Sequence, residues 1–358
     1  MQEIRVMLGE RSYDVVIGSD MLSGLAGRLK DFAFSRMVIV SNPTVYGLHG
    51  KALLSALSSA GFDAPVILVP DGEEYKELLW AYYIYGGLLK QKLDRASAVV
   101  ALGGGVIGDI SGFVASTYMR GISFIQVPTT LLAQVDSSVG GKTGVNHPLG
   151  KNMIGTFHQP RIVWADVSTL RTLPRRELLA GMAEVIKYGV ICDEALFRFL
   201  EEKREKILGL DGGAVEHLVK RSCEIKADVV SKDERETGLR AILNYGHTVG
   251  HAIETVTGYS EYLHGEAVAI GMCLEAEISS LLGIMDRREV ERIRSLVTSY
   301  GLPCRMPSEI DAGGLTAAML HDKKTVAGRL KFILPERIGS VRTETVIDTA
   351  RIIEAIRG

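Results

Sequence analysis

Cysteine is scarce in this sequence, and the few cysteines form no recognisable pattern. The 358 residues include four of them, widely scattered at Cys192, Cys223, Cys273 and Cys304. Because no two form a C-x-x-C pair, the sequence indicates neither a disulfide framework nor a zinc site built from cysteines. We therefore expect free thiols in a reducing cytoplasm.

The sequence also lacks an excess of charge of one sign and any long apolar run. Its 41 basic and 43 acidic side chains give a net charge of −2, which argues against a broad nucleic-acid surface but leaves room for a local basic pocket. The longest weakly polar stretch, residues 96–108, is too short to cross a bilayer. The first residues carry Glu3 and Arg5 and lack the apolar core of a signal peptide. We expect a cytoplasmic protein that binds neither nucleic acid nor a membrane.

The first half of the chain alternates strand-like and helix-like segments. Short apolar runs without alternation are typical of parallel strands that are covered on both faces. Such strand-like runs lie at residues 4–8, 13–17, 37–40, 66–69, 98–102, 124–127 and 162–164. Helix-like segments such as 51–60 and 74–90 lie between them. This pattern predicts an α/β, Rossmann-like nucleotide-binding domain over residues 1–170.

Helical periodicity dominates the second half. Helices are expected at residues 175–191, 194–208, 214–231, 239–257, 266–282 and 287–300. Only residues 332–334 and 340–342 look strand-like. We therefore predict a second, helical domain over residues 171–358, with no internal repeat.

Two glycine-rich segments indicate a site for an anionic ligand. Gly103, Gly105 and Gly108 match G-x-G-x-x-G between a strand and a helix-like run, where backbone N–H groups can approach a diphosphate. The acidic residue that usually follows about 20 positions later is missing, so a plain strand-to-helix turn remains an alternative. In residues 136–155, which look like a flexible loop, Lys142 and Lys151 are candidate anion ligands.

A polar stripe interrupts the otherwise apolar helix expected at residues 239–257. Arg240, Asn244, His247 and His251 are spaced i, i+4, i+7 and i+11, which places them on one face of a helix. Burying such a stripe is costly unless it faces a ligand, a metal or a wet cavity.

His247 and His264 are the strongest candidates for metal ligands. Catalytic zinc commonly has three protein ligands and one open position. The third ligand could be His251, on the same helical face as His247, or Glu184, which shares a face with Lys187 in another apolar helix. Any one of these histidines could instead be a hydrogen-bonded core residue, and Glu184 and Lys187 could form a simple ion pair. The spacing alone leaves both third ligands open.

Several long segments together resemble the 3-dehydroquinate synthases of the sugar-phosphate cyclase family. They are GGGVIGDISGFVASTYMRG (103–121), QVPTTLLAQVDSSVGGKTGVN (126–146), GKNMIGTFHQP (150–160), AGMAEVIKYG (180–189), RETGLRAILNYGHTVGHAIE (235–254) and HGEAVAIGM (264–272). The resemblance implies an N-terminal NAD-binding α/β domain, an all-α metal-binding domain, an active site in the cleft between them, and a homodimer. It also implies that Glu184, His247 and His264 hold a divalent cation, normally zinc, or alternatively cobalt.

The resemblance further implies two sets of contacts. NAD would contact Asn42, Asp71, Gly72, Glu73, Glu74, Tyr75, Lys76, Gly105, Val106, Ile107, Gly108, Asp109, Thr129, Thr130, Lys142, Lys151, Thr169, Leu170, Arg171 and Thr172. The catalytic and substrate-binding residues would be Arg120, Asp136, Lys142, Lys151, Asn152, Lys187, Lys226, Arg240, Asn244, His251 and one lysine of HDKK, which we assign to Lys324 rather than Lys323.

The implied reaction converts 3-deoxy-D-arabino-heptulosonate 7-phosphate, a small sugar phosphate, to 3-dehydroquinate and phosphate. It is a step of the shikimate pathway to aromatic amino acids. Two other enzymes share the same plan: a sister cyclase for another sugar phosphate, and a metal-dependent polyol dehydrogenase. The dehydrogenase would release NADH, whereas the synthase regenerates NAD in each turnover.

Overall fold

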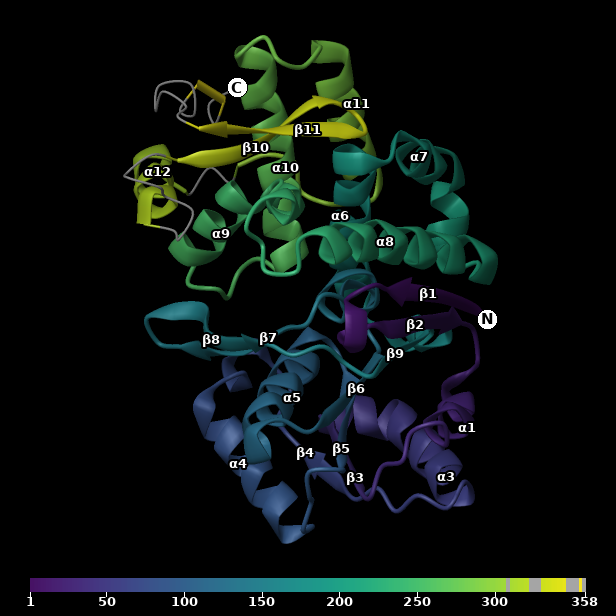
Figure 1. Ribbon diagram of the computed structural model, residues 1–358. Coiled ribbons are helices and arrows are strands. Elements are labelled where there is room, and N and C mark those ends of the chain that lie inside the picture. The colour runs from purple at the N-terminus through teal and green to yellow at the C-terminus, as the bar shows by residue number, and fades with distance from the viewer. Residues whose placement is uncertain (307–309, 322–329, 346–353, 356–358) are drawn as a thin grey trace. The chain divides into compact units, whose positions relative to one another are not determined.

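The computed structural model describes residues 1–306, 310–321, 330–345 and 354–355 (Figure 1). Their contacts divide the chain into two compact units. The first unit contains Met1–Pro174 and Val215–Arg235, and the second contains Arg175–Ala214 and Glu236–Gly358. The boundary between residues 170 and 171 stays a prediction. Among the described helices, none has the length and apolar character needed to span a bilayer.

The first unit is built on a seven-stranded sheet with the order β1-β2-β9-β6-β5-β3-β4. The strands are β1 (Gln2–Val6), β2 (Tyr13–Gly18), β3 (Met37–Ser41), β4 (Val66–Leu68), β5 (Ala98–Gly103), β6 (Ser123–Pro128) and β9 (Ile162–Asp166). All neighbours pair in parallel except β1, which pairs antiparallel with β2. The strand order reverses between β3 and β5, and ligands of open α/β sheets bind at such a switch point.

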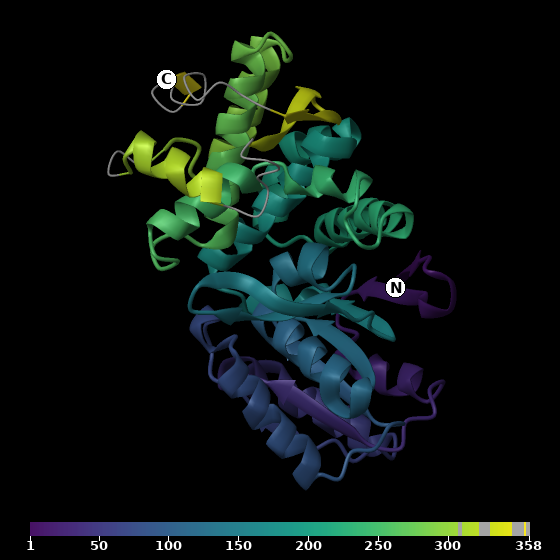
Figure 2. The same cartoon turned by 60° about the vertical axis from the view of Figure 1, so that its left-hand side comes forward.

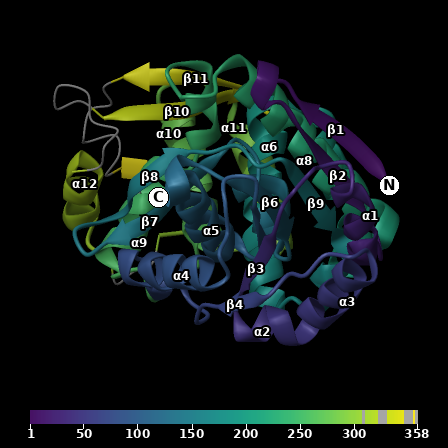
Figure 3. The same ribbon diagram turned by 60° about the horizontal axis from the view of Figure 1, so that its bottom comes forward.

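Helices cover both faces of this sheet. The first unit contains α1 (Leu25–Leu29), α2 (Pro43–Val45), α3 (Lys51–Ser59), α4 (Leu78–Lys90), α5 (Gly105–Thr117) and most of α8 (Gly212–Lys232). Figure 3 shows α4 and α5 on one face of the sheet and α1 and α3 on the other. Side chains alternate along β3 accordingly: Val38 packs toward α4 and α5, and Ile39 toward α1 and α3. The predicted α/β fold is confirmed.

Residues 142–157 form a hairpin, not the flexible loop that the glycines suggested. Strand β7 (Lys142–His147) pairs antiparallel with β8 (Gly150–Phe157). Their glycines allow close backbone packing, because a Cβ atom on Gly144 would lie 2.6 Å from the carbonyl oxygen of Ile154. The loop interpretation was therefore wrong, since glycine in a strand often marks such an approach.

The second unit is helical, with one two-stranded hairpin. Its elements are α6 (Arg175–Cys192), α7 (Glu194–Leu208), α9 (His247–Val256), α10 (His264–Leu281), α11 (Arg287–Ser299), α12 (Ala312–His321), β10 (Lys331–Arg337) and β11 (Ser340–Thr345). Helix α10, the long green helix of Figure 2, packs against α6, α9, α11 and β10. A core of Ile253, Ile270, Leu315 and Phe332 joins α9, α10, α12 and β10.

The helix expected at residues 239–257 is broken. A 3-10 helix, η8 (Leu239–Asn244), ends before Gly246, and α9 begins only at His247. Gly246 has a φ of +79°, a left-handed conformation that residues with a Cβ atom rarely adopt. The prediction of one continuous polar stripe was therefore wrong, although His247 and His251 still share a face of α9.

Candidate functional site

Three side chains of the second unit converge as a candidate metal site. Glu184 on α6, His247 at the start of α9 and His264 at the start of α10 place their ligand atoms within 4.8 Å of one another. Both imidazole Nε2 atoms lie 3.6 Å from Oε1 of Glu184. Ligands about 2.0–2.2 Å from a tetrahedral ion are separated by about 3.4 Å from one another. The three donors therefore fit around one zinc-sized cation.

The other nitrogen of each imidazole is held by a hydrogen-bond acceptor. Nδ1 of His247 lies 3.1 Å from the carbonyl oxygen of Tyr245, and Nδ1 of His264 lies 3.2 Å from Oε2 of Glu254. Since these oxygens accept, each Nδ1 carries a proton, and a bound cation would take the lone pair of each Nε2 on the side that faces Glu184. Metal-binding histidines are commonly oriented in this way.

The charges around His264 also suit a cation. Burial alone lowers the pKa of His264, but the carboxylates of Glu254 and Glu184 outweigh it and raise that pKa to about 9. Glu254 is 3% exposed and was not expected from the sequence. The available signal was its position on α9, three residues after His251, in an otherwise apolar helix.

His251 and Lys187, also expected from the sequence, lie beside the three converging side chains. The His251 ring is centred 5.4 Å from that of His247 and 5.9 Å from that of His264. Lys187 forms an ion pair with Glu184 and is almost fully buried. Arg240 is also buried, and Nδ2 of Asn244 donates to Glu236 at 2.6 Å. Lys324 lies outside the described residues.

In the first unit, several expected NAD-contacting residues follow the carboxyl ends of the parallel strands. Asn42 follows β3, and its Nδ2 donates to Asp71 at 2.8 Å. Gly104 separates β5 from α5, whose first N–H groups have no partner within the helix. Thr129 follows β6, and its N–H donates to the carbonyl oxygen of Gly103 at 3.0 Å. Thr169 and Thr172 lie further along, in the 3-10 helix after β9.

A cluster of opposite charges lies beside these strand ends. Lys76 Nζ lies 2.9 Å from Glu73 and 3.1 Å from Asp109, and Lys151 Nζ lies 3.9 Å from Glu73. Burial lowers the pKa of Lys76, but the charges of Asp109 and Glu73 raise it above its usual value, so Lys76 stays protonated. Asn146 donates to Glu73 at 2.9 Å and joins this cluster, although it was not among the expected contacts.

The remaining expected residues of the first unit are spread more widely. Lys226 on α8 donates to the carboxylate and the carbonyl oxygen of Asp136, each at 2.7 Å. The backbone N–H of Asn152 donates to the Asn146 side chain at 2.9 Å. Arg120 lies just beyond the last turn of α5, whereas Gly105 begins that helix. The 13 residues of α5 separate the two ends by about 20 Å, so Arg120 does not join the other expected residues at the strand ends.

Comparisons with known proteins agree with this architecture. The family model for the N-terminal part of 3-dehydroquinate synthase matches residues 66–180, and the model for the C-terminal part matches residues 181–325. A protein from Thermodesulfovibrio yellowstonii named 3-dehydroquinate synthase is 57% identical over 96% of each chain.

Solved structures of related cyclases have the same fold. The 2-epi-5-epi-valiolone synthase of Streptomyces hygroscopicus subsp. jinggangensis 5008, solved with NAD+ and Zn2+, matches with a TM-score of 0.90 and 27% identity, over 98% of this chain and 97% of that one. A 2-deoxy-scyllo-inosose synthase in complex with carbaglucose-6-phosphate, NAD+ and Co2+ matches with a TM-score of 0.91 and 27% identity, over 99% of each chain. The chain belongs to the 3-dehydroquinate synthase family.

Proposed function

We propose that this protein is a 3-dehydroquinate synthase that converts 3-deoxy-D-arabino-heptulosonate 7-phosphate to 3-dehydroquinate and phosphate. The reaction is a phosphate elimination with transient oxidation at C5, followed by re-reduction, ring opening and intramolecular aldol closure. The observation that carries this proposal is the 57% identity to a named 3-dehydroquinate synthase over 96% of both chains. The convergence of Glu184, His247 and His264 supplies the matching metal chemistry.

Glu184, His247 and His264 are the proposed metal ligands. Their geometry favours Glu184 as the third ligand over His251, whose imidazole belongs with Glu254 and His264 in a second cluster. When bound, NAD would take a hydride from C5 and return it, while zinc or cobalt would polarise the C4 and C5 hydroxyls. His251 would orient or relay the proton of the C5 hydroxyl.

Basic residues are proposed to hold the anionic groups of the substrate. Lys151 and Asn152, with Arg240 or Lys324, would bind the phosphate through charge-assisted hydrogen bonds. Lys142, Lys226 and Asn244 would bind the carboxylate and the ring hydroxyls. The 2.7 Å contact between Lys226 and Asp136 supports this role, because it holds the buried ammonium group in a fixed orientation.

NAD is proposed to bind at the switch point of the sheet, along Asn42, Asp71 and the start of α5. The cluster of Glu73, Lys76 and Asp109 borders this position. The topology supports this position for NAD, because the strand order reverses beside β5 and a helix of 13 residues starts there.

The test is incubation of purified protein with the heptulosonate phosphate, a divalent cation and a catalytic amount of NAD. We expect phosphate to be released many times over with no net accumulation of NADH. Accumulation of NADH without phosphate would favour a polyol dehydrogenase instead. Release of phosphate from another sugar phosphate alone would favour a sister cyclase.

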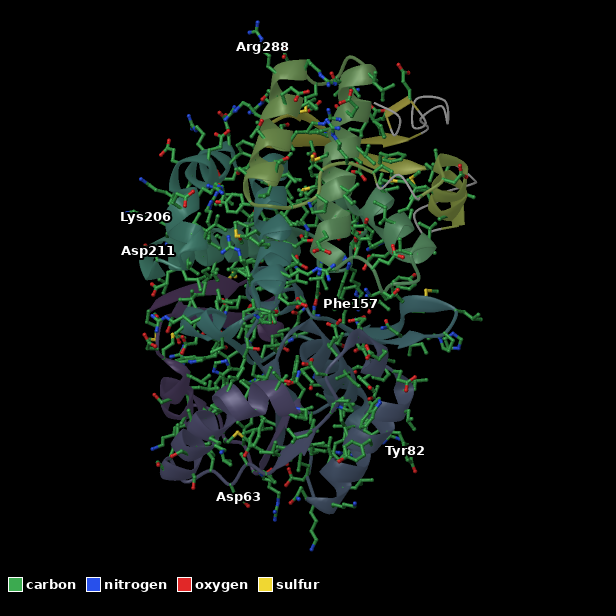
Figure 4. The ribbon with its side chains drawn as sticks, turned by 180° about the vertical axis from the view of Figure 1, so that it is seen from behind. Asp63, Tyr82, Phe157, Lys206, Asp211 and Arg288 are labelled. Atoms are coloured by element: carbon green, nitrogen blue, oxygen red, sulfur yellow. The ribbon has the colours of Figure 1, made fainter. Side chains whose placement is uncertain are left out.

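A cytoplasmic homodimer is proposed as the working form. The first unit exposes Leu79, Tyr82 and Tyr83 on α4, with 67%, 76% and 53% of each residue accessible; Tyr82 is labelled in Figure 4. These side chains line a pocket together with Val66 and Ile67 of the edge strand β4, and exposed apolar patches of this kind commonly mark contact surfaces. Sedimentation of the wild type and of Tyr82→Lys tests this proposal. We expect a dimer that the substitution weakens.

A further inference from the structure

Each candidate metal-binding imidazole is connected by hydrogen bonds to a buried carboxylate, but the two connections differ. Glu254 contacts Nδ1 of His264 directly. Glu275, which is fully buried on α10, contacts the backbone before His247 instead: its Oε2 accepts the N–H of Gly246 at 2.7 Å.

The peptide group between Tyr245 and Gly246 connects Glu275 to His247. Its N–H donates to Glu275, and its carbonyl oxygen accepts from Nδ1 of His247 at 3.1 Å. This peptide is trans, as the described peptide bonds are, so its N–H and C=O groups point in opposite directions. One hydrogen-bonded chain therefore runs from the Glu275 carboxylate through the peptide to the imidazole.

This peptide precedes a residue that needs a fixed conformation. Gly246 has a φ of +79°, and a Cβ atom there would lie 2.8 Å from the carbonyl oxygen of Val268 on α10. The hydroxyl of Tyr245 also donates to the carbonyl oxygen of Met272 at 2.7 Å. The turn before His247 is thus attached to α10, the helix that carries His264 at its first residue.

We propose that Glu275 is a positioning residue for His247, acting through the Tyr245–Gly246 peptide, so that α10 fixes both imidazoles of the metal site. A hydrogen bond to the N–H of a peptide strengthens its carbonyl as an acceptor. That carbonyl in turn holds Nδ1 of His247 and keeps Nε2 directed at the cation. This inference rests on the metal ligands given under the proposed function.

Three substitutions of Glu275 distinguish a positioning role for its side chain from an effect of its negative charge. Glu275→Asp keeps the charge but shortens the reach to Gly246, Glu275→Gln keeps the reach and an acceptor oxygen, and Glu275→Leu removes both. Positioning predicts that zinc affinity, measured by competition with a chelator, falls about tenfold in the Asp and Leu variants. The Gln variant should retain most of the affinity. The visible spectrum of the Co2+-loaded Asp variant should also change, because His247 is reoriented.

Glu277 supplies the matched control. It lies two residues further along α10, is also buried, and binds Arg287 and, at 2.9 Å, Arg294. Glu277→Gln should lower thermal stability and leave zinc affinity and the cobalt spectrum unchanged.

Three results would overturn the inference. Wild-type zinc affinity in Glu275→Asp, or a loss in Glu275→Gln as large as the one expected of Glu275→Asp, would exclude positioning through Gly246. Absence of stoichiometric metal in the wild type would remove the ligand set itself, and this inference with it. If Glu275→Leu does not fold, the Asp and Gln variants decide the question by themselves.

Discussion

Nδ1 of His264 lies 3.2 Å from Oε2 of Glu254, on the helix that packs against α10. A carboxylate in this position fixes the tautomer of the imidazole and increases its basicity as a metal ligand. We expect Glu254→Gln to weaken zinc binding about tenfold and Glu254→Ala about a hundredfold, measured by chelator competition. Glu202→Gln, an exposed glutamate on α7, is the control. Unchanged affinity in both Glu254 variants would exclude this role.

His264→Ala should abolish metal binding and phosphate release, because only two of the three proposed protein ligands remain. Its melting temperature in chelator should resemble that of the metal-free wild type, and added zinc should raise only the wild-type value, since a cation that binds the folded state alone stabilises it. His217→Ala, at an exposed histidine on α8, should behave as the wild type. Full activity of His264→Ala without metal would refute the ligand assignment.

Lys151→Ala should reduce affinity for the substrate phosphate. Contacts between desolvated charges are worth about 2–5 kcal/mol. We expect a loss near the lower end of this range, because the Lys151 side chain is 25% exposed. A loss of about 2 kcal/mol corresponds to an increase of about thirtyfold in KM. Steady-state phosphate release measures this effect, with Lys51→Ala, an exposed lysine on α3, as the control. Wild-type kinetics would dismiss Lys151 as a phosphate ligand.

Gly265→Ala should both destabilise the protein and weaken its metal site. A Cβ atom at residue 265 would lie 1.9 Å from the carbonyl oxygen of Ala180 on α6, one turn before Glu184. Overpacking typically costs about 1–3 kcal/mol of the free energy of unfolding, and here it would also separate His264 from Glu184. Urea unfolding and zinc competition measure the two effects. Gly27→Ala, where a Cβ atom meets nothing within 4 Å, should be tolerated, and equal behaviour of both variants would contradict the prediction.

The sequence predicts the parts of the fold that follow from local pattern. Apolar runs such as residues 98–102 became buried parallel strands, and Gly103–Gly105 forms the expected strand-to-helix turn. Periodicity failed at Gly246, because a single left-handed residue breaks a helix without interrupting the apolar pattern. Glycine content misled at residues 142–157, where the glycines serve close strand pairing.

The candidate site was only partly predictable for a different reason. His247 and His251 are neighbours on one helix, so spacing alone could relate them to each other. Glu184 joins His247 through the packing of α6 and α9 against α10, which no local pattern encodes. Glu254 and Glu275 act through Nδ1 or a backbone N–H group, and in the sequence they appear simply as acidic residues within apolar helices.

The most direct test of the metal site combines elemental analysis with X-ray absorption at the metal edge, on protein loaded with zinc and dialysed. We predict one zinc per chain, coordinated by two imidazole nitrogens and a carboxylate oxygen, and none retained by Glu184→Ala. A wild-type protein that retains no zinc, or a zinc ion without imidazole ligands, would contradict the convergence of Glu184, His247 and His264 on one cation.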